Sequence, residues 1–316
     1  MAISPSRHGV QVPDALVAAH ATYAGERGRA WAGALPALVD ARLDAWRLRT
    51  DGPAACGAVA LVVPVLRADG SPAVLKVQPV DDETEGEPTA LRAWGGDGAV
   101  RLIDHAPATG SMLLERLDAR RSLATVADDL AALETLSGLL ARLTSAPAPE
   151  GMRRLGDIAA RMLERVPPAL ARVADPERRR LLDACAGALA EVRGEPGDRL
   201  LHWDLHYDNV LGAHPSDPRE PWLAIDPKPL AGDPGFDLLP ALHNRWDDVV
   251  ATASVRRAVL RRFDLMTEVV GLDRGRATAW TLARVLQTAL WDLENGDTTA
   301  HSVPDVAIAE ALLAER

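Results

Sequence analysis

The chain has 316 residues, of which 47% are hydrophobic and 25% are charged, and its formal net charge is −10. This composition indicates a globular protein with one large domain or two lobes. The acidic balance argues against a general nucleic-acid binder, which carries a basic face. Two cysteines cannot form a disulfide framework, the N-terminus lacks a signal peptide, and no apolar run reaches the roughly 18 residues of a membrane span. We therefore expect a cytoplasmic protein with no nucleic-acid or membrane partner, acting as a monomer.

The N-terminal part of the chain predicts helices followed by a small sheet. Residues 1–13 are expected to form a loose arm, Asp14 to cap a helix, and residues 28–43 to form a second helix. Alternating apolar positions then predict strands, interrupted by one glycine-containing loop and one helix. The expected strands are 46–50, 58–66, 72–77, 100–104 and 110–117, with the loop at 51–57 and the helix at 88–94.

From Ser122 the sequence becomes helical almost to its end. Apolar residues recur there at three- and four-residue spacing, which is typical of amphipathic helices. We expect an α+β fold of two lobes, with residues 1–118 forming the lobe that holds the sheet and residues 119–316 a helical lobe. The predicted helices are 126–145, 152–173, 176–193, 237–248, 254–271, 274–295 and 303–314.

A dense polar loop lies between two short apolar runs in the stretch 200–211. This pattern predicts a loop pinned between two buried segments. The loop contains Asp204 and, five residues later, Asn209, and the apolar run 222–225 ends at Asp226. A phosphoryl-transferring kinase needs this order, because one carboxylate accepts the substrate hydroxyl proton while the amide and the second carboxylate hold magnesium.

The same stretch resembles a known family. Its motifs are similar to those of the kinase-like aminoglycoside phosphotransferases, and the resemblance extends from about Trp46 to the C-terminal helices. The run 222–239 resembles more specifically the branch of streptomycin 6-phosphotransferases and hydroxyurea phosphotransferases. The motifs are His202-x-Asp204-x(4)-Asn209, Ile225-Asp226 and Gly-Asp-Pro-Gly-Phe-Asp at 232–237.

The resemblance implies a two-lobed protein-kinase-like fold. A small N-lobe would hold a five-stranded antiparallel sheet and a helix, and a larger, mainly helical C-lobe would hold the catalytic loop and the acceptor site. It also implies an enzyme: an ATP- or GTP-dependent phosphotransferase that inactivates an aminoglycoside antibiotic by Mg²⁺-assisted transfer of the γ-phosphate to a hydroxyl group. A neutral acceptor such as hydroxyurea, or an antibiotic-biosynthetic compound, is the alternative substrate.

The nucleotide-binding residues are also implied by the resemblance. Lys76, held by Glu87, would fix the α- and β-phosphates, with Glu85 as the rival partner for this lysine. The loop at 51–57 would cover the phosphates through backbone amides. Backbone groups of about Glu115 to Leu117 would bond the nucleotide base.

We expect the acceptor to be a cationic aminoglycoside, with streptomycin first in line. Streptomycin carries two guanidinium groups, and a planar guanidinium matches a carboxylate in bidentate geometry. Trp203 departs from the resemblance, because the family usually has a small residue there, and a bulky ring would narrow the substrate mouth. The candidate acceptor residues are Trp203, Asp247, Asp248, Trp291 and Glu294, with Asp292, Asp297, Trp246 and Trp280 as further members.

Two other classes of function compete with this interpretation. His202, Asp204, His206 and Asp208 alternate along the chain and could ligate zinc or manganese in a metal-dependent hydrolase. A kinase-fold binding protein without catalysis is the other alternative.

The remaining polar residues of the loop region are given structural roles. We expect His202 to hold the loop through backbone bonds rather than to touch substrate. Asp233 and Asp237 are expected to fix the loop that follows the metal site.

Overall fold

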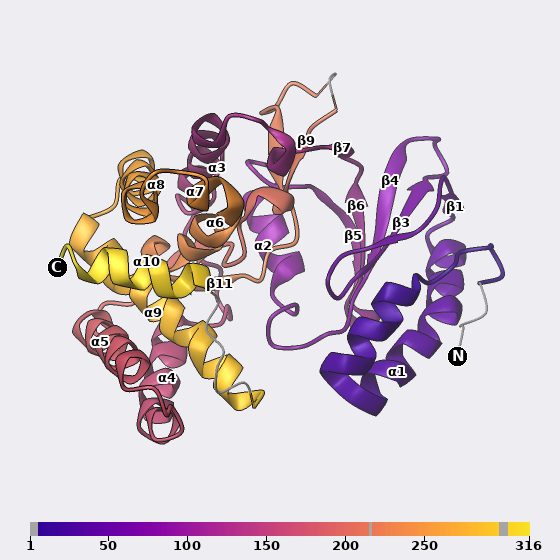
Figure 1. Cartoon of the computed structure of the whole chain (residues 1–316). Helices are drawn as coiled ribbons and strands as arrows, with labels where there is room; N and C mark the ends of the chain where they lie inside the picture. Colours follow the sequence, from indigo (N-terminus) through magenta and orange to yellow (C-terminus); the bar gives the residue numbers. More distant parts are fainter. Residues whose placement is uncertain (1–5, 215–216, 297–302) are drawn as a thin grey trace. The chain divides into compact units, whose positions relative to one another are not determined.

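The computed structural model describes residues 6–214, 217–296 and 303–316, and the chain divides into two compact units (Figure 1). The first unit comprises Met1–Gly96 and Val100–Leu117, and the second comprises Asp97–Ala99 and Asp118–Arg316. Within the described ranges, no helix is long and apolar enough to cross a membrane.

The first unit is built on a six-stranded antiparallel sheet. The strands run in the order β1-β3-β4-β6-β5, and β2 pairs with β3 as a short extra strand. Strand β4 pairs with β3 over Pro72–Val77 and with β6 over Ala73–Val77, so it is the central strand. The strands are β1 Arg49–Thr50, β2 Ala55–Cys56, β3 Leu61–Leu66, β4 Pro72–Val77, β5 Leu102–Ala106 and β6 Ser111–Glu115. The short helix α2, Glu87–Trp94, lies between β4 and β5 in the chain.

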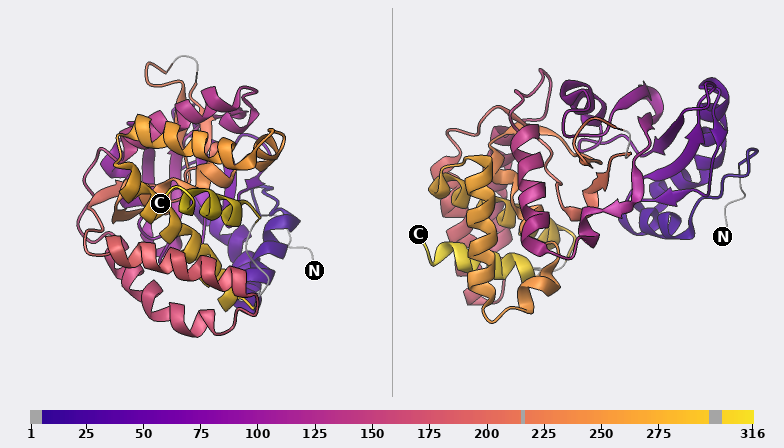
Figure 2. Two further views of the ribbon diagram at one scale, coloured as in Figure 1. Left: turned by 60° about the vertical axis from the view of Figure 1, so that its left-hand side comes forward. Right: turned by 90° about the horizontal axis from the view of Figure 1, so that it is seen from above.

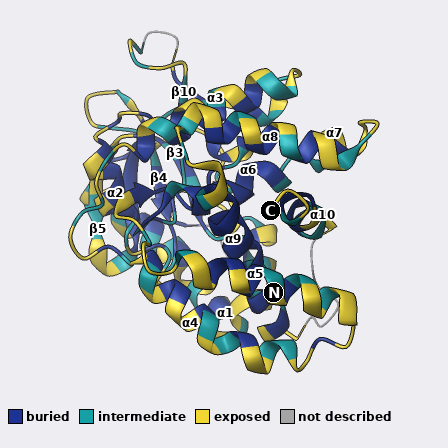
Figure 3. Cartoon of the chain, turned by 90° about the vertical axis from the view of Figure 1, so that its left-hand side faces the viewer, coloured by how far each residue is buried: buried dark blue, intermediate teal, exposed yellow. Residues whose placement is uncertain are grey.

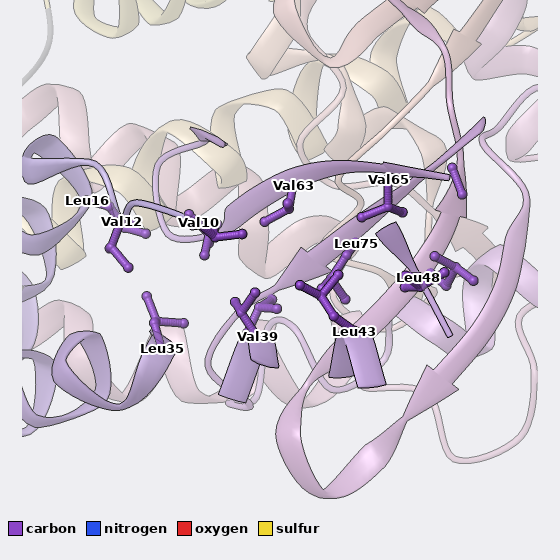
Figure 4. Close-up of a cluster of buried hydrophobic side chains, with 14 residues drawn as sticks. Val10, Val12, Leu16, Leu35, Val39, Leu43, Leu48, Val63, Val65 and Leu75 are labelled. Atoms are coloured by element: carbon purple, nitrogen blue, oxygen red, sulfur yellow. The ribbon is translucent and has the colours of Figure 1, made fainter. Parts of the chain in front are cut away.

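Helix α1, Asp14–Ala45, supplies the apolar layer against this sheet (Figure 4). It is interrupted at Gly25, where φ is 55°, so its two parts correspond to the two helices predicted from the sequence. Asp14 lies in the first turn and Pro13 is the N-cap residue, so the prediction that Asp14 caps this helix was wrong. Leu35, Val39 and Leu43 of α1 meet valines and leucines of β3 and β4 in one buried cluster.

The segment before α1 is not a loose arm where the structure describes it. Val10 and Val12 are only 5% and 8% exposed and belong to the same cluster as α1 and the sheet (Figure 4). The backbone amides of Arg7 and His8 donate to the Asp40 carboxylate at 2.7 and 3.2 Å. Burial of the two valines and these hydrogen bonds fix residues 6–13. The sequence of this segment has no local pattern that predicts such an ordered conformation.

The second unit is mainly helical. Helices α3 and α8 pack against each other, as do α5 and α9, so the helices lie side by side in layers (Figure 2). Helices α3, α5 and α8 each have one buried and one exposed face (Figure 3), as their apolar spacing predicts, whereas α9 is buried over most of its length. The helices are α3 Asp129–Leu143, α4 Leu155–Leu170, α5 Pro176–Val192, α6 Leu239–His243, α7 Trp246–Val250, α8 Val255–Val270, α9 Arg274–Glu294 and α10 Val303–Leu313.

The predicted helix at 237–248 is instead three short elements. The 3-10 helix η4, Pro234–Asp237, is followed by α6 and α7, and Arg245 between them adopts a φ of 52°. A left-handed residue cannot continue an α-helix, so the chain turns there. Apolar periodicity alone does not show such a break.

Two small sheets in this unit frame the polar loop. The strands are β7 Asp118–Ser122, β8 Arg199–Leu201, β9 Val210–Gly212, β10 Trp222–Ala224 and β11 Leu230–Gly232. Strand β9 pairs with β7 and β10, and β8 pairs with β11. The loop between β8 and β9 is therefore pinned at both ends, as predicted.

Candidate active site

His202 anchors the loop that follows β8. Its backbone amide donates to Asp237 Oδ2 at 2.9 Å, its carbonyl accepts from the Lys228 amide at 3.0 Å, and its ring Nε2 lies 3.0 Å from the Ile225 carbonyl oxygen. The ring is fully buried, and burial lowers the pKa of His202 to about 3. The imidazole is therefore neutral at physiological pH and works as a structural tie, as the sequence predicts.

Asp237 and Asp233 tie the following segment to this loop. Asp237 is fully buried, and burial raises its pKa to about 7 although it accepts the backbone amides of His202 and Trp203. Asp233 caps η4 by accepting from the Gly235 amide at 2.8 Å and binds Arg276 Nε at 2.5 Å. Both contacts are those expected of residues that fix the loop.

The structure brings Asp204, Asn209 and Asp226 together. Asn209 Nδ2 donates to the Asp204 carbonyl oxygen at 2.9 Å, and the amide of Ile225, the neighbour of Asp226, donates to the Asn209 carbonyl oxygen at 2.9 Å. Burial raises the pKa of Asp204, which favours a carboxylate that can accept a proton. Asp226 adopts a φ of 57° and lies 3.0 Å from Lys228 Nζ through its Oδ2.

Asn209 and Asp226 fit a magnesium ion. The bond from Asn209 Nδ2 to the Asp204 carbonyl fixes the side-chain amide, so its oxygen remains as an acceptor. An amide oxygen and a carboxylate are hard oxygen ligands, and Mg²⁺ is usually held by one or two such groups plus phosphates and water. A bound cation would compete with Lys228 for the Asp226 carboxylate.

The first unit contains a buried ion pair. Lys76 Nζ on β4 lies 2.7 and 2.8 Å from the two carboxylate oxygens of Glu87 on α2, and Gln78 Nε2 donates to Glu87 Oε2 at 2.6 Å. Glu87 is fully buried, whereas Glu85 is exposed. The geometry therefore resolves the choice left open by the sequence: Glu87 is the partner of Lys76.

The end of β6 carries the residues predicted to meet a nucleotide base. The Glu115 amide already donates to the Arg101 carbonyl at 3.0 Å, and its carboxylate accepts from the Arg101 amide at 2.7 Å. Leu117, half-buried just beyond the strand, is therefore the better candidate for a backbone donor.

The chain matches the family of aminoglycoside/hydroxyurea antibiotic resistance kinases over residues 45–296. It belongs to this family. It is 60% identical over 303 residues to the streptomycin 6-kinase of Streptomyces glaucescens, covering 96% of this chain and 97% of that protein. It is 54% identical over 308 residues to the hydroxyurea phosphotransferase of Kitasatospora aureofaciens, covering 96% of this chain and 86% of that one.

Solved structures show that the fold is the protein-kinase-like fold expected from the sequence. One similar structure is an aminoglycoside phosphotransferase in ternary complex with ADP and hygromycin B, with a TM-score of 0.58 at 13% identity, covering 87% of this chain and 97% of that one. A fructosamine-3-kinase from Thermobifida fusca has a TM-score of 0.54 at 20% identity, covering 87% and 98% of the two chains. The protein is thus an antibiotic resistance kinase with a mixed helix and sheet architecture.

The hydrolase alternative does not fit this kinase. Nε2 of the His202 ring lies 3.0 Å from the Ile225 carbonyl oxygen and Nδ1 lies 3.4 Å from the Asp204 amide, so the ring is held inside the loop. Among residues 6–214, 217–296 and 303–316, no group of three His, Cys, Asp or Glu side chains is arranged to hold a metal ion.

The predicted acceptor acids lie on two different elements of the kinase. Asp247 and Asp248 are exposed on α7, and Asp248 Oδ2 is ion-paired with Arg245 at 2.7 Å. Asp292 and Glu294 lie in the last turn of α9, where Glu294 is ion-paired with Arg165 of α4. Two of the acids are thus already neutralised by arginines.

The predicted tryptophans have unequal positions. Trp280 is fully buried and packs edge-on against Phe236 at 6.0 Å, so the prediction that it offers stacking surface was wrong. Trp203 is also buried, at 3% exposed, with its ring 5.8 Å from that of Trp291. Trp246 is half-buried on α7, and Asp297 lies outside the described residues.

Sequence reasoning missed two arginines beside Trp203. The guanidinium groups of Arg153 and Arg284 lie 4.7 and 4.8 Å from the Trp203 ring centroid. The spacing of residues 280, 284, 287 and 291 along α9 places them on one helical face. This spacing could have indicated that Arg284 lies beside the tryptophans. The sequence alone did not distinguish Arg284 from an ordinary exposed arginine.

Proposed function

We propose that this kinase is a streptomycin 6-kinase, which transfers the γ-phosphate of a nucleoside triphosphate to a hydroxyl of streptomycin. The observation that carries the proposal is the arrangement of Asp204, Asn209 and Asp226 in the second unit. Asn209 Nδ2 donates to the Asp204 carbonyl oxygen, and the amide of Ile225, next to Asp226, donates to the Asn209 carbonyl oxygen, both at 2.9 Å. Support for the substrate comes from the names of its relatives, since two streptomycin 6-kinases are 60% and 56% identical to it over nearly their whole length.

Phosphoryl transfer asks the protein mainly for positioning and charge neutralisation. Asp204 orients the acceptor hydroxyl and takes its proton, and its burial-raised pKa suits this role. Asn209 and Asp226 hold Mg²⁺, which neutralises the phosphate charge when it is bound. Lys76, fixed by Glu87, binds the α- and β-phosphates through its ammonium group.

The donor nucleotide binds along β4 and the end of β6 in this proposal. Lys76 belongs to the central strand β4, so sheet pairing on both sides holds its position. The backbone at Leu117 supplies a hydrogen bond to the base. Glu115 holds this segment in place, because its carboxylate accepts a hydrogen bond from the Arg101 amide. These contacts do not distinguish ATP from GTP.

The catalytic role of Asp204 is tested by Asp204→Ala. We expect turnover to fall by roughly 10²–10⁴-fold, the usual contribution of a positioned base, with nucleotide affinity little changed. Asp208→Ala is the matched control, because Asp208 belongs to the same loop but its carboxylate is exposed and contacts His206 and Asn244. Near-normal turnover in folded Asp204→Ala would refute the proposal.

The acceptor is tested by nucleoside diphosphate release with streptomycin, a deoxystreptamine aminoglycoside and hydroxyurea, each at two salt concentrations. Charge attraction between a cationic acceptor and acids in a wet cleft is screened by salt, so KM for streptomycin should rise with salt. A neutral acceptor should show almost no such change. Salt-independent turnover of hydroxyurea without streptomycin turnover would show that hydroxyurea is the substrate, and the kinase assignment would stand. The 54% identity to a hydroxyurea phosphotransferase motivates this alternative, which is less favoured than streptomycin because the streptomycin 6-kinases are 60% and 56% identical.

A further inference from the structure

Arg284 lies at the centre of an aromatic cluster in the second unit. Its guanidinium carbon is 4.8 Å from the Trp203 ring centroid, 5.2 Å from that of Trp291 and 5.7 Å from that of Phe236. Its Nη1 donates to Gln287 Oε1 at 2.6 Å, which fixes the orientation of the planar group. A cation over an aromatic face gains about 0.5–2 kcal/mol, and more when both are removed from water.

Two cations lie close to the Trp203 ring. Arg153 lies 4.7 Å from the Trp203 ring centroid and donates through Nη2 to the Lys228 carbonyl oxygen at 3.3 Å. The Trp203 backbone has a φ of 66°, a left-handed conformation that is costly for a bulky residue. Packing between Arg153, Arg284 and Trp291 therefore stabilises a backbone that is unfavourable on its own, directly before Asp204.

Helix α9 is closely seated against the segment that anchors this loop. A Cβ atom on Gly235 would lie 2.9 Å from the Ala277 Cα, so only glycine permits the observed approach. Thr281 Oγ1 donates to the Gly235 carbonyl oxygen at 3.2 Å. Asp237, two residues later, holds the His202 amide. The position of Arg284 on α9 is thus fixed relative to the catalytic loop.

We propose that Arg284 is a positioning residue for phosphoryl transfer: it clamps the Trp203 ring and thereby fixes the backbone that places Asp204. This inference rests on the proposed role of Asp204. Its charge also opposes the burial-driven rise in the pKa of Asp237, the carboxyl that holds the His202 and Trp203 amides. Partial burial of an arginine costs desolvation free energy that an apolar side chain in the same space would not. This cost is expected where the charge has a function beyond packing.

The test compares variants of Arg284 with a matched arginine on the same helix. Arg284→Met keeps the length of the side chain but removes the charge and the planar group, and should lower kcat by about 10–100-fold, the scale of a misplacement near 1 Å. Arg284→Lys keeps a cation over the ring and should recover part of this loss. Arg274→Met is the control, because Arg274 also lies over an aromatic ring, Phe263 at 5.7 Å, and its kcat should be unchanged.

Separate measurement of kcat and KM distinguishes positioning from substrate binding. A positioning role predicts lower kcat with KM for acceptor and nucleotide within about twofold, and a melting temperature close to that of Arg274→Met. A rise in acceptor KM at unchanged kcat would overturn the proposal, because Arg284 would then contact the substrate. Unchanged kcat and KM in folded Arg284→Met would overturn it as well.

A double-mutant cycle with Asp204→Ala shows whether Arg284 acts through Asp204. In the Asp204→Ala background, Arg284→Met should cause no further loss of turnover, and an additional loss of tenfold or more would refute the mechanism. If Asp204→Ala itself keeps near-normal turnover, the proposed function fails. If Asp204→Ala is inactive while Arg284→Met is normal, only this inference fails.

Trp203→Phe tests the same positioning role if Arg284→Met does not accumulate as folded protein. The Trp203 indole N–H has no acceptor among the described residues, so this change removes ring area and no hydrogen bond. We expect kcat to fall by about 3–10-fold at unchanged KM, because the smaller ring offers less surface to the two guanidinium groups. Wild-type kcat in Trp203→Phe would overturn the clamp.

Discussion

Removing Lys76 alone should destabilise the first unit more than removing both partners of its buried ion pair. Glu87 is fully buried, and both of its carboxylate oxygens lie within 2.8 Å of Lys76 Nζ. Lys76→Met replaces this ammonium by a thioether and leaves a buried carboxylate facing the Gln78 amide at 2.6 Å. Breaking a buried pair in this way costs about 3–5 kcal/mol, since the carboxylate loses the ammonium group and stays in the interior.

The double variant Lys76→Met/Glu87→Gln should recover at least about half of that loss. It removes the carboxylate charge, and the new amide can accept the hydrogen bond that Gln78 donates. Urea unfolding followed by hydrogen exchange of β4 and α2 amides reports on the first unit alone. Turnover should stay low in both variants, because neither has the proposed phosphate-binding ammonium.

Two outcomes would refute this reasoning. Lys76→Met within about 1 kcal/mol of the wild type would mean that the carboxylate is compensated by other groups or is not buried in solution. A double variant no more stable than Lys76→Met would mean that lost packing, and not the isolated charge, causes the destabilisation.

Two further predictions concern the buried His202 ring and the contact between Gly235 and helix α9. The folded chain keeps His202 neutral, with its pKa lowered from 6.5 to about 3, so its contribution to stability is complete above about pH 6.5 and is lost as pH falls toward 3. The full loss of stability from this histidine is about 4–5 kcal/mol. Asp237, with its pKa raised to about 7, changes the stability in the opposite direction as pH falls. The test is therefore urea unfolding as a function of pH, in which the stability of His202→Gln should fall less toward acid pH than that of the wild type. Gly235→Ala should cost about 1–3 kcal/mol and lower kcat, because its Cβ would lie 2.9 Å from the Ala277 Cα. Gly187→Ala, in open space on α5, is the control for calorimetry and should not destabilise; equal melting temperatures for the two variants would contradict the steric argument.

The sequence predicted the parts of the fold that depend on local pattern. The strand at 72–77 and most C-terminal helices occur within a few residues of their predicted bounds, since apolar periodicity reports directly on which face is buried. Residues 6–13 were missed because their order depends on a sheet formed much later in the chain. The break at Arg245 was missed because a left-handed residue leaves no mark on hydrophobic spacing.

The candidate site shows the same division. The kinase-like order of Asp204, Asn209 and Asp226 predicted that they meet. Asp204 and Asn209 share the short loop between β8 and β9, and Asp226 follows β10, which pairs with β9. The acceptor acids were chosen by charge and by their expected place near turns on the acceptor side, and the sequence could not show that Asp248 and Glu294 have arginine partners. The contact between Trp203 and Arg284 joins residues 81 positions apart, so only the folded chain reveals it.

The packing of the N-terminal segment makes the fold of this kinase vulnerable to proteolytic trimming. Val10 and Val12 contribute side chains to the buried cluster that joins α1 to the sheet of the first unit. Full burial of two such side chains is worth about 3–6 kcal/mol, a large part of the 5–15 kcal/mol that typically separates a folded from an unfolded domain. A protease that cuts at Pro13 would therefore spare every residue proposed to bind nucleotide, metal or acceptor, and would still shorten the lifetime of the enzyme and of any resistance it confers.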